Sequence, residues 1–189
     1  MIDLPPPPTH VQQIENIAAC GIARDAISIV YQDVLQSDEI TISDAGAPSE
    51  AKWLCLRGAV HPFYALTLSD PEQRTSYYEV DLREGHREAR ANARAWLAAN
   101  HMLGRVPIYR SETGIDRFAR EIEAACSVVP GSAIAIHGES LLTIRTEFLA
   151  AQLDYHVGGA MTCLSHMIAA SNASEAGISF GFIGNEANR

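Results

Sequence analysis

The sequence has little of several residue types, and each shortage narrows what the protein can be. Of its 14 basic residues, Lys52 is the sole lysine and the others are arginine. This bias is typical of high-GC coding sequences and indicates a bacterial or phage origin. No run of 18 uncharged apolar residues occurs, so no membrane-spanning helix is expected. The segment Met1–His10 lacks a basic start and an apolar run, so we do not expect a secretory signal.

Positive charge and aromatic residues are also scarce. The net charge is −9 and the isoelectric point is near 5.2. This balance argues against bulk nucleic-acid binding and against an anionic membrane surface, since both need clustered positive charge. Aromatic residues make up 7% of the chain, whereas hydrophobic residues make up 47%. We therefore expect a folded protein with a core of Ala, Leu, Ile and Val.

The cysteines are few and widely spaced. Cys20, Cys55, Cys126 and Cys163 form no CxxC pair and no dense framework. This pattern is typical of a reduced, intracellular chain, so we expect four unpaired, buried cysteines and a cytoplasmic location. The sequence also lacks HExxH, an EF-hand loop, GxGxxG and a phosphate-binding loop. No cofactor is expected.

The hydrophobic patterns predict an α+β protein dominated by helices, a compact helical domain with a small β element; an all-α fold is the alternative. Pro5–Pro8 cannot be helical, so residues 1–9 are expected to form a proline-rich arm. Residues 10–189 are expected to form a single globular domain. It should end in a C-terminal strand, because apolar residues alternate in Ile178–Ile183. No repeat is visible at the periods of solenoid proteins.

Individual elements follow from spacing and capping residues. Asp70 and Pro71 are typical of an N-cap and a first helical residue, so a long helix should begin there and run to about Leu103, with Gly104 at its end. Other helices are expected at 10–20, 23–36, 50–59 and 114–128. Three segments can be read as helix or strand: Ile27–Val34, Phe63–Ser69 and Ala133–Ile144.

The most distinctive feature is a row of arginines within the long predicted helix. Arg83, Arg87, Arg90 and Arg94 are spaced four, three and four residues apart, which places them on one helix face. Acidic residues precede Arg83 and Arg87 by one turn, but none precedes the other two. Arg90 and Arg94 are therefore expected to reach an acidic partner or a phosphate. A plain solvated face is the alternative.

Two further groups of residues could carry chemistry. Glu147, Asp154 and His156 lie close in sequence and could act together as an acid–base cluster if a cleft raised one pKa. His156, Cys163 and His166 could ligate a metal such as zinc or copper. In the alternative interpretation, the acids face solvent and the sulfur belongs to the core.

These features predict a non-enzymatic interaction or assembly protein that acts within a protein complex. Its partner would be another protein or a second copy of the chain, met through the arginine row. The alternative is a small enzyme that uses the Glu/Asp/His cluster on an anionic substrate. The sequence leaves open whether the protein is an enzyme.

Overall fold

A computed structural model describes residues 8–34, 36–61, 64–153 and 159–181. The chain divides into two compact units, a first unit at Met1–Gly85 and a second unit at His86–Arg189. The sequence predicted one globular domain over 10–189, whereas each unit has its own sheet and its own hydrophobic core. The N-terminal arm lies outside the described residues except for Pro8 and Thr9, and Thr9 caps the first helix.

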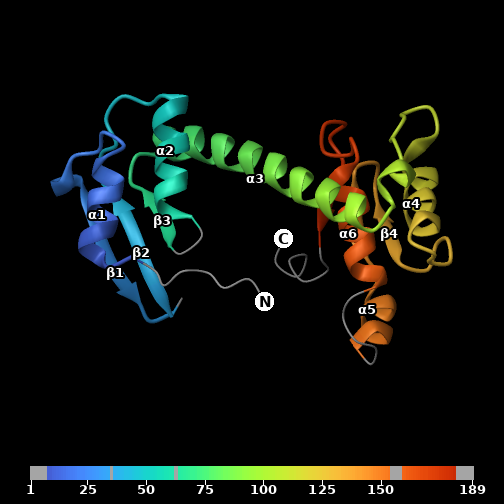
Figure 1. The fold of residues 1–189 in the computed structure, drawn as a ribbon. Coiled ribbons are helices and arrows are strands. Elements are labelled where there is room, and N and C mark those ends of the chain that lie inside the picture. The colour runs from blue at the N-terminus through green and yellow to red at the C-terminus, as the bar shows by residue number, and fades with distance from the viewer. Residues whose placement is uncertain (1–7, 35, 62–63, 154–158, 182–189) are drawn as a thin grey trace. The chain divides into compact units, whose positions relative to one another are not determined.

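The first unit is a three-stranded sheet packed against helices (Figure 1). Strand β1 lies at one edge, antiparallel to β2, and β3 is parallel to β2 on the other side. The elements in order are α1 (His10–Ala18), a 3-10 turn (Arg24–Ala26), β1 (Ile27–Gln32), β2 (Ser37–Ile42), α2 (Glu50–Val60), β3 (Ala65–Leu68) and the first half of α3 (Pro71–Ala99).

Alternating β-branched residues explain the sheet of the first unit. Ile40 and Ile42 are fully buried, whereas Thr41 between them faces away from the core. The helix expected at 23–36 is wrong, because Ile27–Gln32 pairs with β2 as a strand. Helix α2 buries Trp53, Leu56 and Val60 against the sheet, at the spacing of one helix face.

The second unit repeats this arrangement. Strand β4 is antiparallel to β5, and β6 is parallel to β5 on the other side. Its core gathers buried residues from the second half of α3, from α4, from α6 and from the sheet. The elements in order are the second half of α3, a 3-10 turn (Leu103–Arg105), α4 (Gly114–Ala125), β4 (Ile134–His137), β5 (Leu141–Ile144), α5 (Thr146–Leu153), α6 (Ala160–Ala170) and β6 (Ser179–Gly181).

The helix-dominated α+β class is confirmed. Asp70 accepts a hydrogen bond from the Gln73 N–H at 2.9 Å, so it caps α3 as expected. The helix ends at Ala99, before Gly104, because His101 takes a positive φ of 58°. The three ambiguous segments contain strands. Among the described residues, no helix is both long and apolar enough to cross a membrane.

The expected C-terminal strand exists as β6, and it pairs with β5 of the same chain. Only part of the predicted run Ile178–Ile183 is described, since residues 182 and 183 lie outside the described ranges. The described part of this strand therefore belongs to the sheet of its own unit.

The two units are structural repeats. Each has a helix, an antiparallel strand pair, a helical crossover and a third strand parallel to the second. The central strands carry matching triplets, Ile40–Ile42 and Leu142–Ile144, each with threonine in the middle. Each repeat is far longer than a solenoid repeat, so the sequence shows no periodicity of solenoid length.

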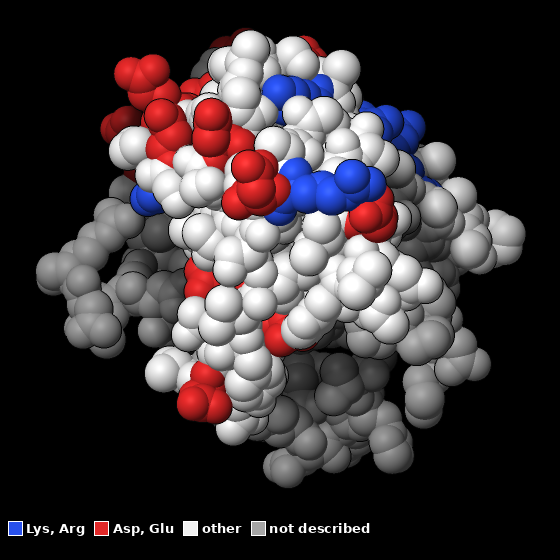
Figure 2. Space-filling model, turned by 90° about the vertical axis from the view of Figure 1, so that its left-hand side faces the viewer, with Lys and Arg blue, Asp and Glu red and all other residues white. Residues whose placement is uncertain are grey.

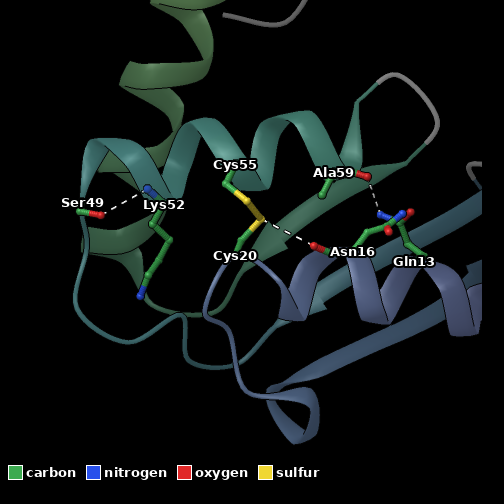
Figure 3. The surroundings of a disulfide bond; sticks show 7 residues. All are labelled: Gln13, Asn16, Cys20, Ser49, Lys52, Cys55 and Ala59. Atoms are coloured by element: carbon green, nitrogen blue, oxygen red, sulfur yellow. Dashed lines mark hydrogen bonds between the residues drawn. A yellow bond between two sulfur atoms is a disulfide. The ribbon is translucent and has the colours of Figure 1, made fainter.

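Each unit contains one disulfide in the corresponding place. Cys20 lies just after α1 and is bonded to Cys55 in α2; Cys126 lies just after α4 and is bonded to Cys163 in α6. Figure 3 shows Cys20 and Cys55 joining the end of α1 to the middle of α2. The expectation of four unpaired cysteines is therefore wrong. The spacing missed the pairing because each bond joins the end of one helix to a residue within another, 35 or 37 residues away in sequence, and packing brings them together.

The phenol of Tyr77 in α3 is expected to titrate at a higher pH than an ordinary tyrosine. Its ring packs edge-on against Trp53, with centroids 5.9 Å apart. Burial, and secondarily Asp81, raise the pKa of Tyr77 to about 12, against the opposing effect of Arg57. The phenol is protonated in both states below its unfolded pKa near 10, and the stability it contributes is lost as the pH rises towards 12. Phenolate absorbance should show a tyrosine that titrates towards pH 12 and disappears in Y77F, whereas Tyr64, whose pKa burial also raises, should keep its own titration in that variant.

Candidate docking edge

The structure places the arginine row on α3 but pairs two of its members within the chain. Arg83 Nη2 lies 2.7 Å from Glu50 Oε1. Arg90, expected to reach another surface, pairs with Glu175 and lies 3.3 Å from the Ser174 hydroxyl. Glu175 follows Arg90 by 85 residues, so no spacing within the helix could have revealed this pair.

The other two members differ from each other. Arg87 also interacts within the chain. Arg94 is exposed and has no recorded partner among the described residues. On the face drawn in Figure 2, Lys and Arg side chains lie beside Asp and Glu side chains. Two of the four arginines therefore form ion pairs within the chain, and such pairs contribute little each at an exposed surface.

The proposed acid–base cluster falls mostly outside the described residues and stays a prediction. Glu147 is exposed in the first turn of α5, and Asp154 and His156 lie outside the described ranges. The described members of the proposed metal set, Cys163 and His166, have other partners. Cys163 is bonded to Cys126, so its sulfur is no thiolate ligand. His166 Nδ1 lies 2.7 Å from the Thr162 carbonyl, and no metal-binding cluster occurs among the described residues.

The outer edge of β1 is the most distinctive open feature of the first unit. The Ser43 N–H donates to the Ala26 carbonyl at 2.9 Å, so these two residues form a hydrogen-bonded pair. In an antiparallel ladder such pairs alternate, so alternate residues from Ser28 onward face β2. Ile29 and Tyr31 therefore direct both backbone groups away from β2. In the described part of the chain, β1 pairs with β2 alone.

As far as the described residues go, this edge lacks the usual protection against strand pairing. Proteins commonly protect an edge strand with lysine, proline or a covering segment. The strand Ile27–Gln32 contains no charged residue and no proline. Val30 is 53% exposed, Tyr31 is 56% exposed and Val34, just beyond the strand, is 95% exposed. Apolar side chains and unpaired backbone groups thus occur together.

The corresponding edge of the second unit is covered at its start. The Arg145 N–H donates to the Ala133 carbonyl at 2.8 Å, so Ile134 directs its backbone groups outward. The Ile134 N–H donates to Glu123 Oε1 at 2.8 Å, and its carbonyl accepts from Arg145 Nε at 3.2 Å. Glu123 also accepts from Ala133 N–H at 2.7 Å and from Gly131 N–H. Two charged side chains therefore occupy the start of this edge.

The first unit has neither of these covering side chains. Ile17, three residues before Cys20, corresponds to Glu123, three residues before Cys126. Ser43, directly after β2, corresponds to Arg145, directly after β5. Sequence reasoning missed this contrast because it requires the alignment of two repeats that share few identical residues. At the position equivalent to Ile134, the Ile27 N–H donates to the Arg24 carbonyl, so the two edges differ in that charged side chains occupy the start of β4 and none of the described ones occupies the start of β1.

No protein-family model, curated protein or solved structure matches this chain. The geometry of the β1 edge therefore carries the functional argument.

Proposed function

We propose that this protein is a non-enzymatic interaction protein that binds an extended segment of a partner protein along β1. The partner segment would add a fourth strand to the sheet of the first unit. Backbone hydrogen bonds to Ile29 and Tyr31 would supply affinity, and contacts with Val30 and Tyr31 would supply selectivity. The observation that carries the proposal is the β1 edge itself, which pairs on one side only among the described residues, carries no charge and exposes Val30 and Tyr31.

We further propose that the protein works in an oxidising compartment rather than in the cytoplasm. All four cysteines are consumed in two disulfides, one in each unit. Disulfides persist in oxidising environments and are rare in reducing ones. Thiol titration of protein taken directly from its native source should find no free thiol; four free thiols would contradict this assignment.

Strand addition can be tested with a short peptide of alternating valine and threonine with a serine at each end. We expect saturable binding, with the Ile29 and Tyr31 amides becoming protected from hydrogen exchange. Tyr31→Pro removes one outward-facing N–H but leaves the β2 ladder intact, because Tyr31 does not donate to β2. Its affinity should fall at least about tenfold, as expected for one lost hydrogen bond and a steric clash.

Tyr31→Thr is the matched control. It removes the ring but keeps the backbone donor, so peptide affinity should change by less than about threefold, within the range of side-chain pair effects. Circular dichroism should show that both variants fold. Equal affinities for the two variants, or no protection of the Ile29 amide by the peptide, would refute strand addition.

A further inference from the structure

The charge of the first unit selects the kind of partner. Residues 1–85 contain thirteen acidic and five basic residues, whereas residues 86–189 contain ten acidic and nine basic ones. Almost the whole net charge therefore belongs to the unit with the open edge. An acidic surface raises the local concentration of basic partners and repels acidic ones.

The acidic groups nearest the edge are placed at its two ends. Asp25 lies just before β1 and Asp33 just after it, and both are exposed. Neither has a recorded partner among the described residues. The intervening strand Ile27–Gln32 is uncharged. The edge thus presents an apolar centre between two carboxylates.

The other charged groups near this strand have partners of their own. Glu39, opposite Val30 on β2, accepts hydrogen bonds from the Gln32 amide at 2.9 Å and the Thr67 hydroxyl at 2.6 Å. Arg24 binds Glu15 through two hydrogen bonds of 2.9 and 2.6 Å. Asp38 Oδ2 lies 2.8 Å from His10 Nε2. Because Arg24 is neutralised by its own partner, it does not offset the carboxylates of Asp25 and Asp33.

These charges argue against a second copy of the chain as the occupant. Antiparallel pairing of two β1 strands about their centre would bring Asp25 of each copy close to the end that carries Asp33 in the other. Like charges placed opposite each other across paired strands are destabilising. Two first units would also repel each other through their large negative charge.

We infer that the segment received by β1 belongs to a basic partner protein, with an apolar extended stretch of about six residues and a lysine or arginine near each end. This inference rests on the proposed function, strand addition at β1. The two basic residues would face the carboxylates of Asp25 and Asp33, and the apolar stretch would pack on Val30 and Tyr31. The carboxylates of Asp25 and Asp33 would then select which segments bind, whereas the backbone hydrogen bonds of β1 would hold any extended segment.

The test compares three peptides with the same alternating valine–threonine centre and with lysine, serine or glutamate at both ends. At low salt we expect the lysine peptide to bind about fivefold more tightly than the serine peptide, as for two exposed ion pairs. The glutamate peptide should bind most weakly. At about 0.5 M salt the differences should largely vanish.

Two double variants separate a local effect from one of net charge. Asp25→Asn with Asp33→Asn should abolish the preference for lysine and leave the serine peptide unchanged. Glu112→Gln with Glu139→Gln removes two exposed acids from the second unit and should keep the preference. Equal binding of the lysine and serine peptides at low salt, or equal effects of the two double variants, would overturn the inference but leave strand addition standing.

The remaining outcomes are also decisive. If the serine and lysine peptides both fail to protect the Ile29 amide, the proposed function itself fails. If light scattering shows a dimer that Tyr31→Pro disrupts and Tyr31→Thr does not, the occupant is a second copy and the basic partner is excluded. A monomer that prefers the lysine peptide supports the inference.

Discussion

Removal of the Cys126–Cys163 disulfide, in the variant C126A/C163A, is expected to lower the free energy of unfolding of the second unit by about 4 kcal/mol. The bond closes a loop with a sequence separation of 37 residues. In the chain-entropy description, a cross-link of this span restricts the unfolded chain by about that amount. The second unit has a single small sheet, so this loss is a large part of its stability.

Cys20 and Cys55 provide an internal comparison. Their sequence separation is 35 residues, so C20A/C55A should destabilise the first unit by a similar amount. Cys55 is exposed, whereas Cys163 is 5% exposed. Limited reduction followed by alkylation should therefore modify Cys20 and Cys55 first. Reduction of both bonds at the same rate would contradict the expectation that burial protects the Cys126–Cys163 bond.

The two tryptophans allow each unit to be followed separately. Trp53 belongs to the first unit and Trp96 to the second. In a Trp53→Phe background, Trp96 fluorescence during urea unfolding should show the shift caused by C126A/C163A and little effect of C20A/C55A. A Trp96→Phe background should give the reverse. If the two transitions always move together, the units do not unfold independently.

Glu123→Ala is expected to destabilise the second unit by about 3 kcal/mol or more. The carboxylate is fully buried and accepts hydrogen bonds from three backbone N–H groups, those of Gly131, Ala133 and Ile134. Its removal leaves these donors without acceptors at the start of β4. Hydrogen bonds to charged groups each contribute about 1.5–3 kcal/mol, and buried donors are costly to leave unpaired.

Glu121→Ala is the matched control on the same helix. Glu121 is exposed and forms an ion pair with Arg117 at 2.8 Å, so its removal should cost less than about 1 kcal/mol. Urea unfolding followed by Trp96 fluorescence measures both variants. Glu123→Gln keeps one acceptor oxygen and should fall between them. Equal stabilities of the alanine variants would show that the Glu123 hydrogen bonds do not hold β4.

Glu123 also connects stability with specificity. Glu123 accepts the outward-facing N–H of Ile134 at the start of β4. Left free, this donor could pair with a further strand. The equivalent edges of the two sheets, those of β1 and β4, thus differ in which side chains lie at them. Charged side chains of the same unit cover the start of the β4 edge, whereas the β1 edge presents Val30 and Tyr31 to solvent.

The sequence by itself determined the local elements of this protein. Helical spacing and capping identified α4 and the start of α3, because these signals depend on residues within one or two turns. The pattern at Ile27–Val34 left helix and strand open, because β-branched residues occur in both and pairing decides between them. Pairing of β1 with β2 settled that segment.

Only the tertiary structure decided the division into two units, the pairing of the cysteines and the partners of the arginines. Arg90 meets Glu175, and Cys126 meets Cys163, across separations that no local pattern records. The same holds for the β1 edge, since its openness depends on which side chains reach it from other elements. Contacts between distant segments follow from packing around a shared core, and a sequence pattern of period two or 3.6 carries no information about them.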